Sequence, residues 1–150
     1  MNKSTVKLSF KPKAVVKGLL GGLSERPRDV LINRFGLSES PEKMTLEAIG
    51  DVYGITRERV RQIENHALEG VRKSDAFSAN SHIFNELKDT MDSLGGILAE
   101  EYLLSLFSED PILQNHMNIL FVLSPYFMRV KEGAEFSHRW HSDRELAEAV

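Results

Sequence analysis

Residues 44–73, MTLEAIGDVYGITRERVRQIENHALEGVRK, contain two amphipathic segments separated by a glycine turn. Each segment repeats apolar residues three or four positions apart, which is the spacing of one helix face. The apolar positions are Leu46, Ile49, Val52 and Tyr53 in the first segment and Val60, Ile63, Ala67 and Val71 in the second. The stretch therefore predicts two consecutive short helices.

The residues at the helix ends predict how the two helices are joined. Thr45 and Thr56 are natural N-caps, and Gly54 stands where a helix often ends in a left-handed residue. Helices joined by so short a turn must cross at a steep angle, and Gly50 has no side chain to obstruct the crossing. We predict a helix-turn-helix.

The second helix has a polar outer face. At 100° per residue, the side opposite its apolar stripe carries Arg57, Glu58, Arg61, Gln62, Asn65 and Glu69. Arg suits guanine, Gln and Asn suit adenine, and Glu suits cytosine in the major groove. Arg59, Arg72 and Lys73 lie beside or beyond this strip, where they could meet phosphates. The alternative is a solvated helix face with salt bridges, but a charged face behind a glycine turn favours DNA reading.

Four blocks of this sequence carry a family resemblance. Residues 23–31 (LSERPRDVL), 34–37 (RFGL), 45–50 (TLEAIG) and 54–64 (GITRERVRQIE) are similar to region four of bacterial primary sigma factors. The resemblance covers about residues 19–73. It implies a domain that binds the upstream (minus-35) promoter element and whose first helices hold the flap of the RNA polymerase β subunit.

The resemblance adds residue roles to the face analysis. Arg57, Glu58, Arg61 and Gln62 match positions that contact bases and backbone in that family. The full set of predicted DNA-binding residues is Thr45, Thr56, Arg57, Glu58, Arg59, Arg61, Gln62, Asn65, Arg72 and Lys73. The predicted polymerase contact is Leu19, Leu20, Leu31 and Phe35. For these four residues we favour the alternative of simple core packing, because large apolar side chains are mostly buried.

The rest of the chain predicts a second module. Residues 1–13 read as a flexible basic arm, residues 14–74 as the helix-turn-helix domain and residues 80–142 as a winged-helix-like domain. In the last of these we expect helices at 82–94, 99–107 and 111–123 and a β-hairpin with strands at 126–130 and 136–140. This half is weakly similar to the HARE-HTH winged helix. A capping box at 142–145 opens a further helix at 142–150, so we expect the natural chain to continue beyond Val150. The predicted fold class is mainly α.

Charge is divided unequally between the two halves. Residues 1–73 carry 14 Lys and Arg against 9 Asp and Glu, a net +5, whereas residues 74–150 carry 5 against 13, a net −8. A basic half favours a polyanion partner, although one fold with uneven surface charge is the simpler alternative. The segment 111–123 has no Lys or Arg, so we expect the second half to contact protein rather than DNA.

Several function classes are excluded. The chain has no cysteine, which excludes disulfides, cysteine-ligated zinc and thiol catalysis. The longest apolar run, at 119–123, is far too short to cross a membrane. We expect a cytoplasmic location, at the bacterial nucleoid. His138 and His141, with Asp143 nearby, make a poor metal site because residues three apart on a strand face opposite sides. There is no phosphate-binding glycine loop, so neither an enzyme nor a cofactor is expected.

These observations predict a sequence-specific, double-stranded DNA-binding transcription regulator that recognises a promoter element through the helix 57–73. The rival is an interaction protein that mimics a sigma factor and binds RNA polymerase or an anti-sigma partner, with only incidental DNA binding. No segment resembles the sigma region that melts promoter DNA, so we expect something other than a complete housekeeping sigma factor. The target site, the direction of regulation and the oligomeric state are left open by the sequence.

Overall fold

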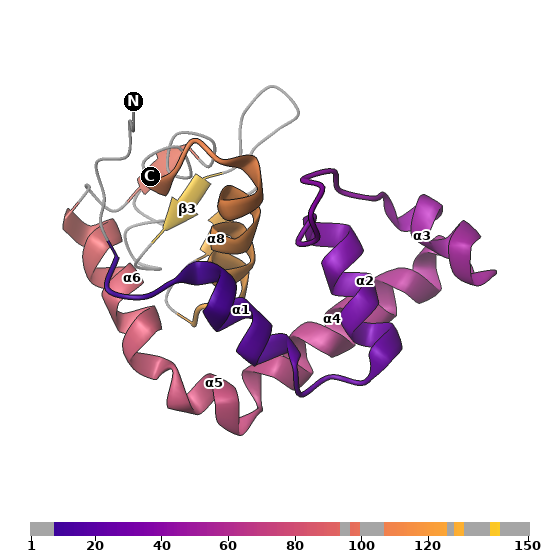
Figure 1. Ribbon diagram of the computed structural model, residues 1–150, viewed down its shortest axis with the longest axis horizontal. Coiled ribbons are helices and arrows are strands. Elements are labelled where there is room, and N and C mark those ends of the chain that lie inside the picture. The colour runs from indigo at the N-terminus through magenta and orange to yellow at the C-terminus, as the bar shows by residue number, and fades with distance from the viewer. Residues whose placement is uncertain (1–7, 94–96, 100–106, 126–127, 131–138, 142–150) are drawn as a thin grey trace.

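The computed structural model describes residues 8–93, 97–99, 107–125, 128–130 and 139–141, and this part of the chain is mainly helical (Figure 1). Its helices are α1 (Pro12–Leu20), α2 (Glu25–Phe35), α3 (Leu46–Tyr53), α4 (Arg57–Arg72), α5 (Asp75–Ala79), α6 (Ser81–Ser93) and α8 (Pro111–Leu123). Three short strands complete it: β1 (Ile97–Ala99), β2 (Met128–Val130) and β3 (Arg139–His141).

The helix-turn-helix begins and ends at the predicted residues. The Thr45 hydroxyl accepts a hydrogen bond from the Ala48 backbone N–H at 3.0 Å, and the Thr56 hydroxyl accepts one from the Arg59 N–H at 3.1 Å. Each bond satisfies one of the N–H groups that a helix start leaves free. Gly54 ends α3 in the left-handed conformation, with φ 69° and ψ 34°. The sequence prediction of this motif is confirmed.

Gly50 lies at the crossing of α3 and α4, as predicted. The Ile55 backbone N–H donates a hydrogen bond to the Gly50 carbonyl at 2.9 Å, which draws the turn against α3. A Cβ atom at position 50 would lie only 2.5 Å from the Ile55 carbonyl oxygen. The close approach of the two backbones therefore depends on glycine at this position.

A small apolar core holds α2, α3 and α4 together. Val30, Ile49 and Val60, one from each helix, have no exposed surface. One predicted member of the apolar face of α3 is outside this core: Val52 is 66% exposed. Its position on the helix explains the difference, because Leu46, Ile49 and Tyr53 lie within about 60° of one another around the axis and Val52 lies beyond the edge of that arc.

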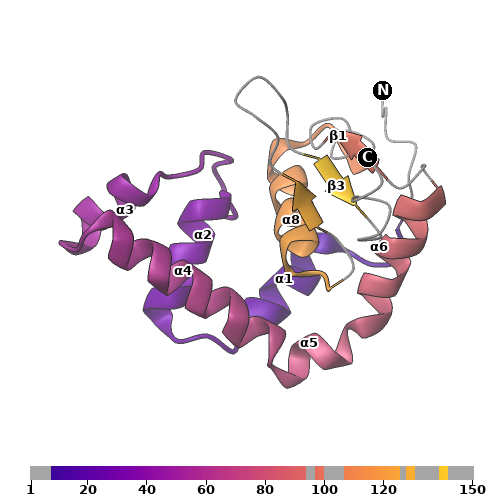
Figure 2. The same cartoon turned by 180° about the vertical axis from the view of Figure 1, so that it is seen from behind.

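A larger core joins the two halves of the sequence. Figures 1 and 2 show α1 beside α8, and the two helices contribute Val16, Leu19, Met117 and Leu120 to one buried cluster. Leu31 of α2, the end of α4, the buried face of α6 and Phe107 also belong to this cluster. The predicted domains 14–74 and 80–142 thus share a hydrophobic core, and their division remains a prediction.

The N-terminal residues differ from the predicted flexible arm. Leu8 and Phe10 pack against the larger core, and the Ser9 backbone N–H donates to a carboxylate oxygen of Glu86 at 2.9 Å. The Ser9 hydroxyl bonds to the same carboxylate. Pro12 opens α1, where its missing N–H costs no helical hydrogen bond. Residues 8–10 therefore pack on the larger core and on α6, and residues 12–13 form the start of α1. Residues 1–7 lie outside the described part.

In the second half, α6 and α8 agree with the predicted helices. Residues 97–99 form strand β1, which antiparallel pairing places beside β3, so Ala99 does not begin a helix. Strands β2 and β3 overlap the two predicted strands and also pair antiparallel, giving the sheet order β1-β3-β2. Residues 131–138, where the predicted hairpin turn and the start of its second strand fall, and the predicted helix 142–150 lie outside the described residues, as do residues 100–106. The sequence analysis did not predict α5.

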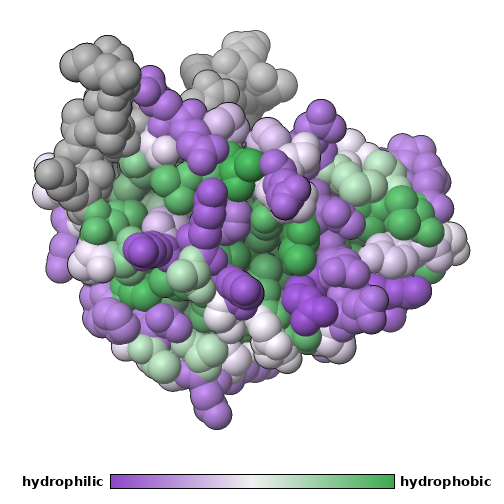
Figure 3. All heavy atoms as spheres, in the orientation of Figure 1, coloured by the Kyte–Doolittle hydropathy of each residue, from purple (hydrophilic) through white to green (hydrophobic). Residues whose placement is uncertain are grey.

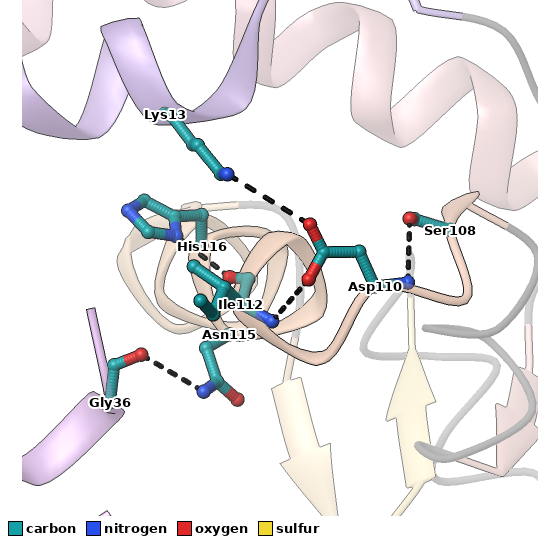
Figure 4. Close-up of polar contacts among 7 residues, drawn as sticks. All are labelled: Lys13, Gly36, Ser108, Asp110, Ile112, Asn115 and His116. Atoms are coloured by element: carbon teal, nitrogen blue, oxygen red, sulfur yellow. Dashed lines mark hydrogen bonds and ion pairs between the residues drawn. The ribbon is translucent and has the colours of Figure 1, made fainter. Parts of the chain in front are cut away.

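Asn115 of α8 ties the loop before the helix-turn-helix to the second half. Its buried side-chain amide donates to the Gly36 carbonyl at 3.0 Å (Figure 4) and to the Pro41 carbonyl, also at 3.0 Å. Gly36 has φ 66°, and a Cβ there would lie 2.7 Å from the Asn115 amide nitrogen. The left-handed glycine therefore both ends α2 and makes room for this amide.

We expect Asn115→Ala to lower the free energy of unfolding by about 1–3 kcal/mol, because two loop carbonyls lose their hydrogen-bond donor. Urea denaturation followed by circular dichroism measures the change. Asn85→Ala is the matched control: Asn85 is exposed on α6, and its replacement should change stability by less than about 0.5 kcal/mol. Equal losses of unfolding free energy in the two variants would show that the Asn115 hydrogen bonds to Gly36 and Pro41 do not stabilise the fold.

Candidate nucleic-acid interface

The N-terminal half of α4 lies at one end of the molecule, beside α3 and away from α6 and the sheet (Figures 1 and 2). All six residues predicted for its outer face are exposed: Arg57, Glu58, Arg61, Gln62, Asn65 and Glu69. On the opposite side Val60, Ala67 and Val71 are buried, and Ile63 is half-buried. The acidic second half therefore leaves this polar face uncovered.

The polar side chains of this face pair with one another along the helix. Arg61 forms an ion pair with Glu58, with its Nε 2.6 Å from the carboxylate. Arg59 donates to the side-chain oxygen of Gln62 at 3.3 Å. Exposed pairs of this kind contribute only about 0.2–1 kcal/mol. These pairs keep the side chains on the outer face and add little stability, so a stronger hydrogen-bonding partner can displace the pairs.

The same ion pair fixes the charge state of two residues. The hydrogen bond from Arg61 lowers the pKa of Glu58 below its usual value, with smaller contributions from the charges of Arg61 and Arg57. The hydrogen bond from Glu58 raises the pKa of Arg61. Both groups are therefore charged at neutral pH, with Glu58 able only to accept hydrogen bonds and Arg61 only to donate them.

Thr45 and Thr56 are exposed at the N-termini of α3 and α4. Each hydroxyl uses one lone pair to cap its helix and still has a proton to donate. A helix N-terminus favours an anion nearby, because its free N–H groups and its dipole are positive. The two threonines are therefore placed where a phosphate oxygen could be bound.

Two basic residues predicted for phosphate contacts differ in their surroundings. Lys73 is exposed at the end of α4. Arg72 is half-buried, pairs with Glu69 at 2.8 Å and donates to the Val122 carbonyl of α8, also at 2.8 Å. Its guanidinium satisfies the C-terminal end of α8, so Arg72 links the two halves rather than pointing freely to solvent.

Sequence reasoning missed the residues that fix α4 in place. Arg34 of α2 pairs with Glu64 of α4 at 2.8 Å and also donates to the Met44 carbonyl, next to the cap of α3. The guanidinium of Arg26 lies 4.6 Å from the centre of the Tyr53 ring, which joins α2 to α3. These pairs are 27 or 30 residues apart in sequence, and no helical periodicity could have found them.

The predicted polymerase contact is largely covered. Leu19, Leu20 and Leu31 have at most 4% of their surface exposed and belong to the core shared with α8, and Phe35 packs against that core half-buried. This agrees with the core-packing alternative. In this structure none of the three leucines offers an open surface to a partner, and Phe35 is only partly exposed.

The described residues also bear on metal binding and on membrane spanning. Within that part of the chain, no group of three or more His, Cys, Asp or Glu side chains is arranged to hold a metal ion. The side chains of His138, His141 and Asp143, already a poor metal site by spacing, lie outside it. Nor is any helix in the described ranges long and apolar enough to span a membrane.

The local geometry agrees with a family comparison. Residues 19–73 match the family described as Sigma-70, region 4. This part of the chain is therefore similar to sigma-70 region 4. The match includes α2, α3 and α4 with their caps and ends where α5 begins, so the second half of the chain has no part in it.

Individual relatives match the same segment. The RNA polymerase sigma factor RpoS of Coxiella burnetii is 58% identical over 53 residues, which is 35% of this chain and 15% of the relative. SigA1 of Synechococcus elongatus is 51% identical over 57 residues, 38% of this chain and 14% of the relative. RpoD of Helicobacter pylori is 45% identical over 60 residues, which is 40% of this chain and 9% of the relative. The matched part thus spans less than a sixth of each of these sigma factors.

Proposed function

We propose that this protein binds double-stranded DNA sequence-specifically, as a transcription regulator, through the N-terminal half of α4. One observation supports this above the others: the exposed strip Arg57, Glu58, Arg61, Gln62 and Asn65 lies behind a capped glycine turn. A recognition helix enters the major groove with its N-terminal residues against the base edges. The sigma-70 region 4 segment, found in proteins named RNA polymerase sigma factors, makes a promoter element the favoured target.

The side chains at this end of α3 and α4 can contact both the bases and the phosphate backbone of DNA. Arg61 suits guanine, Gln62 suits adenine and Glu58 suits cytosine, while the hydroxyls of Thr45 and Thr56 suit phosphate oxygens. Breaking the exposed Glu58–Arg61 pair costs little, so it does not prevent base contact.

The proposal is tested by selecting bound sites from random duplexes and then measuring affinities on the best site at fixed salt. Arg61→Ala and Gln62→Ala should each weaken binding by about 1–3 kcal/mol and relax the preference at one base pair. Asn85→Ala, on exposed α6, should leave affinity unchanged. Unchanged affinity and base preference in both strip variants would contradict the proposal.

Residues 80–142 are proposed to be a winged-helix-like module that does not read DNA. The order α6, β1, α8, β2, β3 and the antiparallel sheet β1-β3-β2 support the architecture. In such a module α8 would be the recognition helix. Here α8 has no Lys or Arg, and most of its residues are buried, with Met117, Ile119 and Leu120 having no exposed surface. A helix packed against α1 and lacking cations is poorly suited to a DNA groove.

RNA polymerase is a second candidate partner, favoured by the similarity of residues 19–73 to proteins named RNA polymerase sigma factors. Because Leu19, Leu20 and Leu31 are buried here, a polymerase contact through them would require α8 to move away. Co-purification with core polymerase, with weak DNA binding that hardly varies with salt, would favour this candidate over the DNA reader. A steep fall of affinity with salt would favour the DNA reader, because each neutralised phosphate steepens that slope.

A further inference from the structure

A cavity of about 310 Å³ lies where α1, α2 and α8 meet. Its lining combines apolar side chains with nitrogen-bearing ones. The apolar residues are Val16, Leu20, Ile32 and Leu37, and the nitrogen-bearing residues are Lys13, Lys17, Arg28 and His116. Figure 3 shows hydrophobic surface in the hollow between α1 and α2, bordered by hydrophilic side chains. This cavity is distinct from the outer face of α4.

The positive charge at the cavity is poorly neutralised. No carboxylate lines it. In the described part of the chain, neither Lys17 nor Arg28 has an ion-pair partner, and Lys13 only reaches Asp110, at 3.9 Å between two exposed side chains (Figure 4). So long and exposed an ion pair contributes little. Three cations around one hollow, of which only Lys13 has an ion-pair partner in the described residues, therefore create a positive potential.

His116 is the buried polar group of this site, with 7% of its surface exposed. Its Nδ1 lies 2.8 Å from the Ile112 carbonyl oxygen. Because a carbonyl can only accept, Nδ1 is the donor and carries the proton. The other ring nitrogen, Nε2, has no hydrogen-bond partner among the described residues. In the neutral ring Nε2 is therefore an acceptor, so the donors for an anion at this cavity are the cationic side chains rather than His116.

We propose that this cavity binds a small amphipathic anion: a carboxylate or phosphate monoester on a short apolar body. The Arg28 guanidinium can bind such a head group with two parallel hydrogen bonds, and Lys17 adds a second positive charge. The apolar body would pack against Val16, Leu20 and Ile32. An adjoining hollow of about 430 Å³ shares Lys13, Leu37 and His116 with this cavity and is also lined by Ser38, Glu39 and Ile112. It leaves room for a longer uncharged body, since the Glu39 carboxylate would repel a second anionic group. This site does not depend on DNA binding.

Isothermal titration calorimetry on the full chain tests the proposal with hexanoate, hexyl phosphate, 1-hexanol and inorganic phosphate. At least one hexyl anion should bind about tenfold or more tightly than both 1-hexanol and inorganic phosphate, since charged head and apolar body each contribute. The tighter of the two hexyl anions identifies the head group.

Variants assign the binding to this cavity. Arg28→Gln should weaken the better anion about tenfold. Lys43→Gln, an exposed cation that does not line the cavity, should leave its affinity unchanged. If Arg28→Gln fails to fold, exposed Lys17→Gln takes its place with the same expected direction. The proposal is overturned if neither anion binds, if 1-hexanol or inorganic phosphate binds as tightly, or if a folded cavity variant binds like the parent.

Discussion

Leu19→Ala is expected to lower the free energy of unfolding by about 2–5 kcal/mol, the range for truncating a fully buried leucine. Leu19 has 1% of its surface exposed and belongs to the core shared by α1, α4, α6 and α8. The loss combines the transfer free energy of the removed methyl groups with the cost of the cavity they leave. A surface contact residue would show almost none of this effect.

Urea denaturation gives the stability, and NMR amide signals report the unfolding of α3 and α8 separately. Because the core is shared, we expect both helices to be destabilised by Leu19→Ala and to unfold in one transition. Val52→Ala is the matched control, since Val52 is 66% exposed, and it should change stability by less than about 0.5 kcal/mol. A change of that small size at Leu19 would show that Leu19 is not part of a shared core.

The helix-turn-helix could be predicted from sequence because everything that determines it is local. Thr45, Gly54 and Thr56 act on backbone groups within five residues, and Gly50 meets a carbonyl only five positions later. Propensity, capping and apolar period all favour the same structure here. The outer face of α4 was predictable for the same reason, since helix geometry alone decides which residues share a side.

The docking of α1 on α8 could not be predicted in this way. An apolar face shows that a helix is buried but does not say which other face covers it. Leu19 and Leu120 are about a hundred residues apart, and the Asn115 contacts with Gly36 and Pro41 span 79 and 74 residues. The same limit explains Arg72, whose charge suggested a phosphate contact while its guanidinium binds the Val122 carbonyl.

The docking of α1 on α8 explains how the acidic half of the chain is placed relative to the outer face of α4. The two halves of opposite net charge are joined by the shared core, yet the uncovered end of α4 lies away from the acidic half. Exposed charges separated by more than about 8–10 Å are largely screened at physiological salt. The acidic half therefore need not weaken a polyanion at α4, and net charge over the whole chain is a poor guide to its partner.

Gly50→Ala is expected to destabilise the protein by about 1–3 kcal/mol, the usual cost of adding a methyl group to a packed site. The added Cβ would lie 2.5 Å from the Ile55 carbonyl oxygen, and 3.6 Å from the Arg57 nitrogen. The obstructing atom belongs to the backbone, so no rotamer change can relieve the clash. Either α3 and α4 move apart or the turn between them opens, and both changes displace the N-terminal end of α4.

Gly18→Ala separates this clash from the general effect of replacing a helical glycine. Gly18 is in α1, with nothing within 4 Å of an added Cβ, so alanine there should stabilise the helix by about 0.5–1 kcal/mol. The two replacements are chemically identical and are expected to have opposite signs in urea denaturation. Binding to the selected duplex should weaken at least about tenfold for Gly50→Ala, given that the displaced end of α4 carries Arg61 and Gln62, the residues proposed to contact bases. Parental stability together with parental DNA affinity would show that the crossing does not position α4.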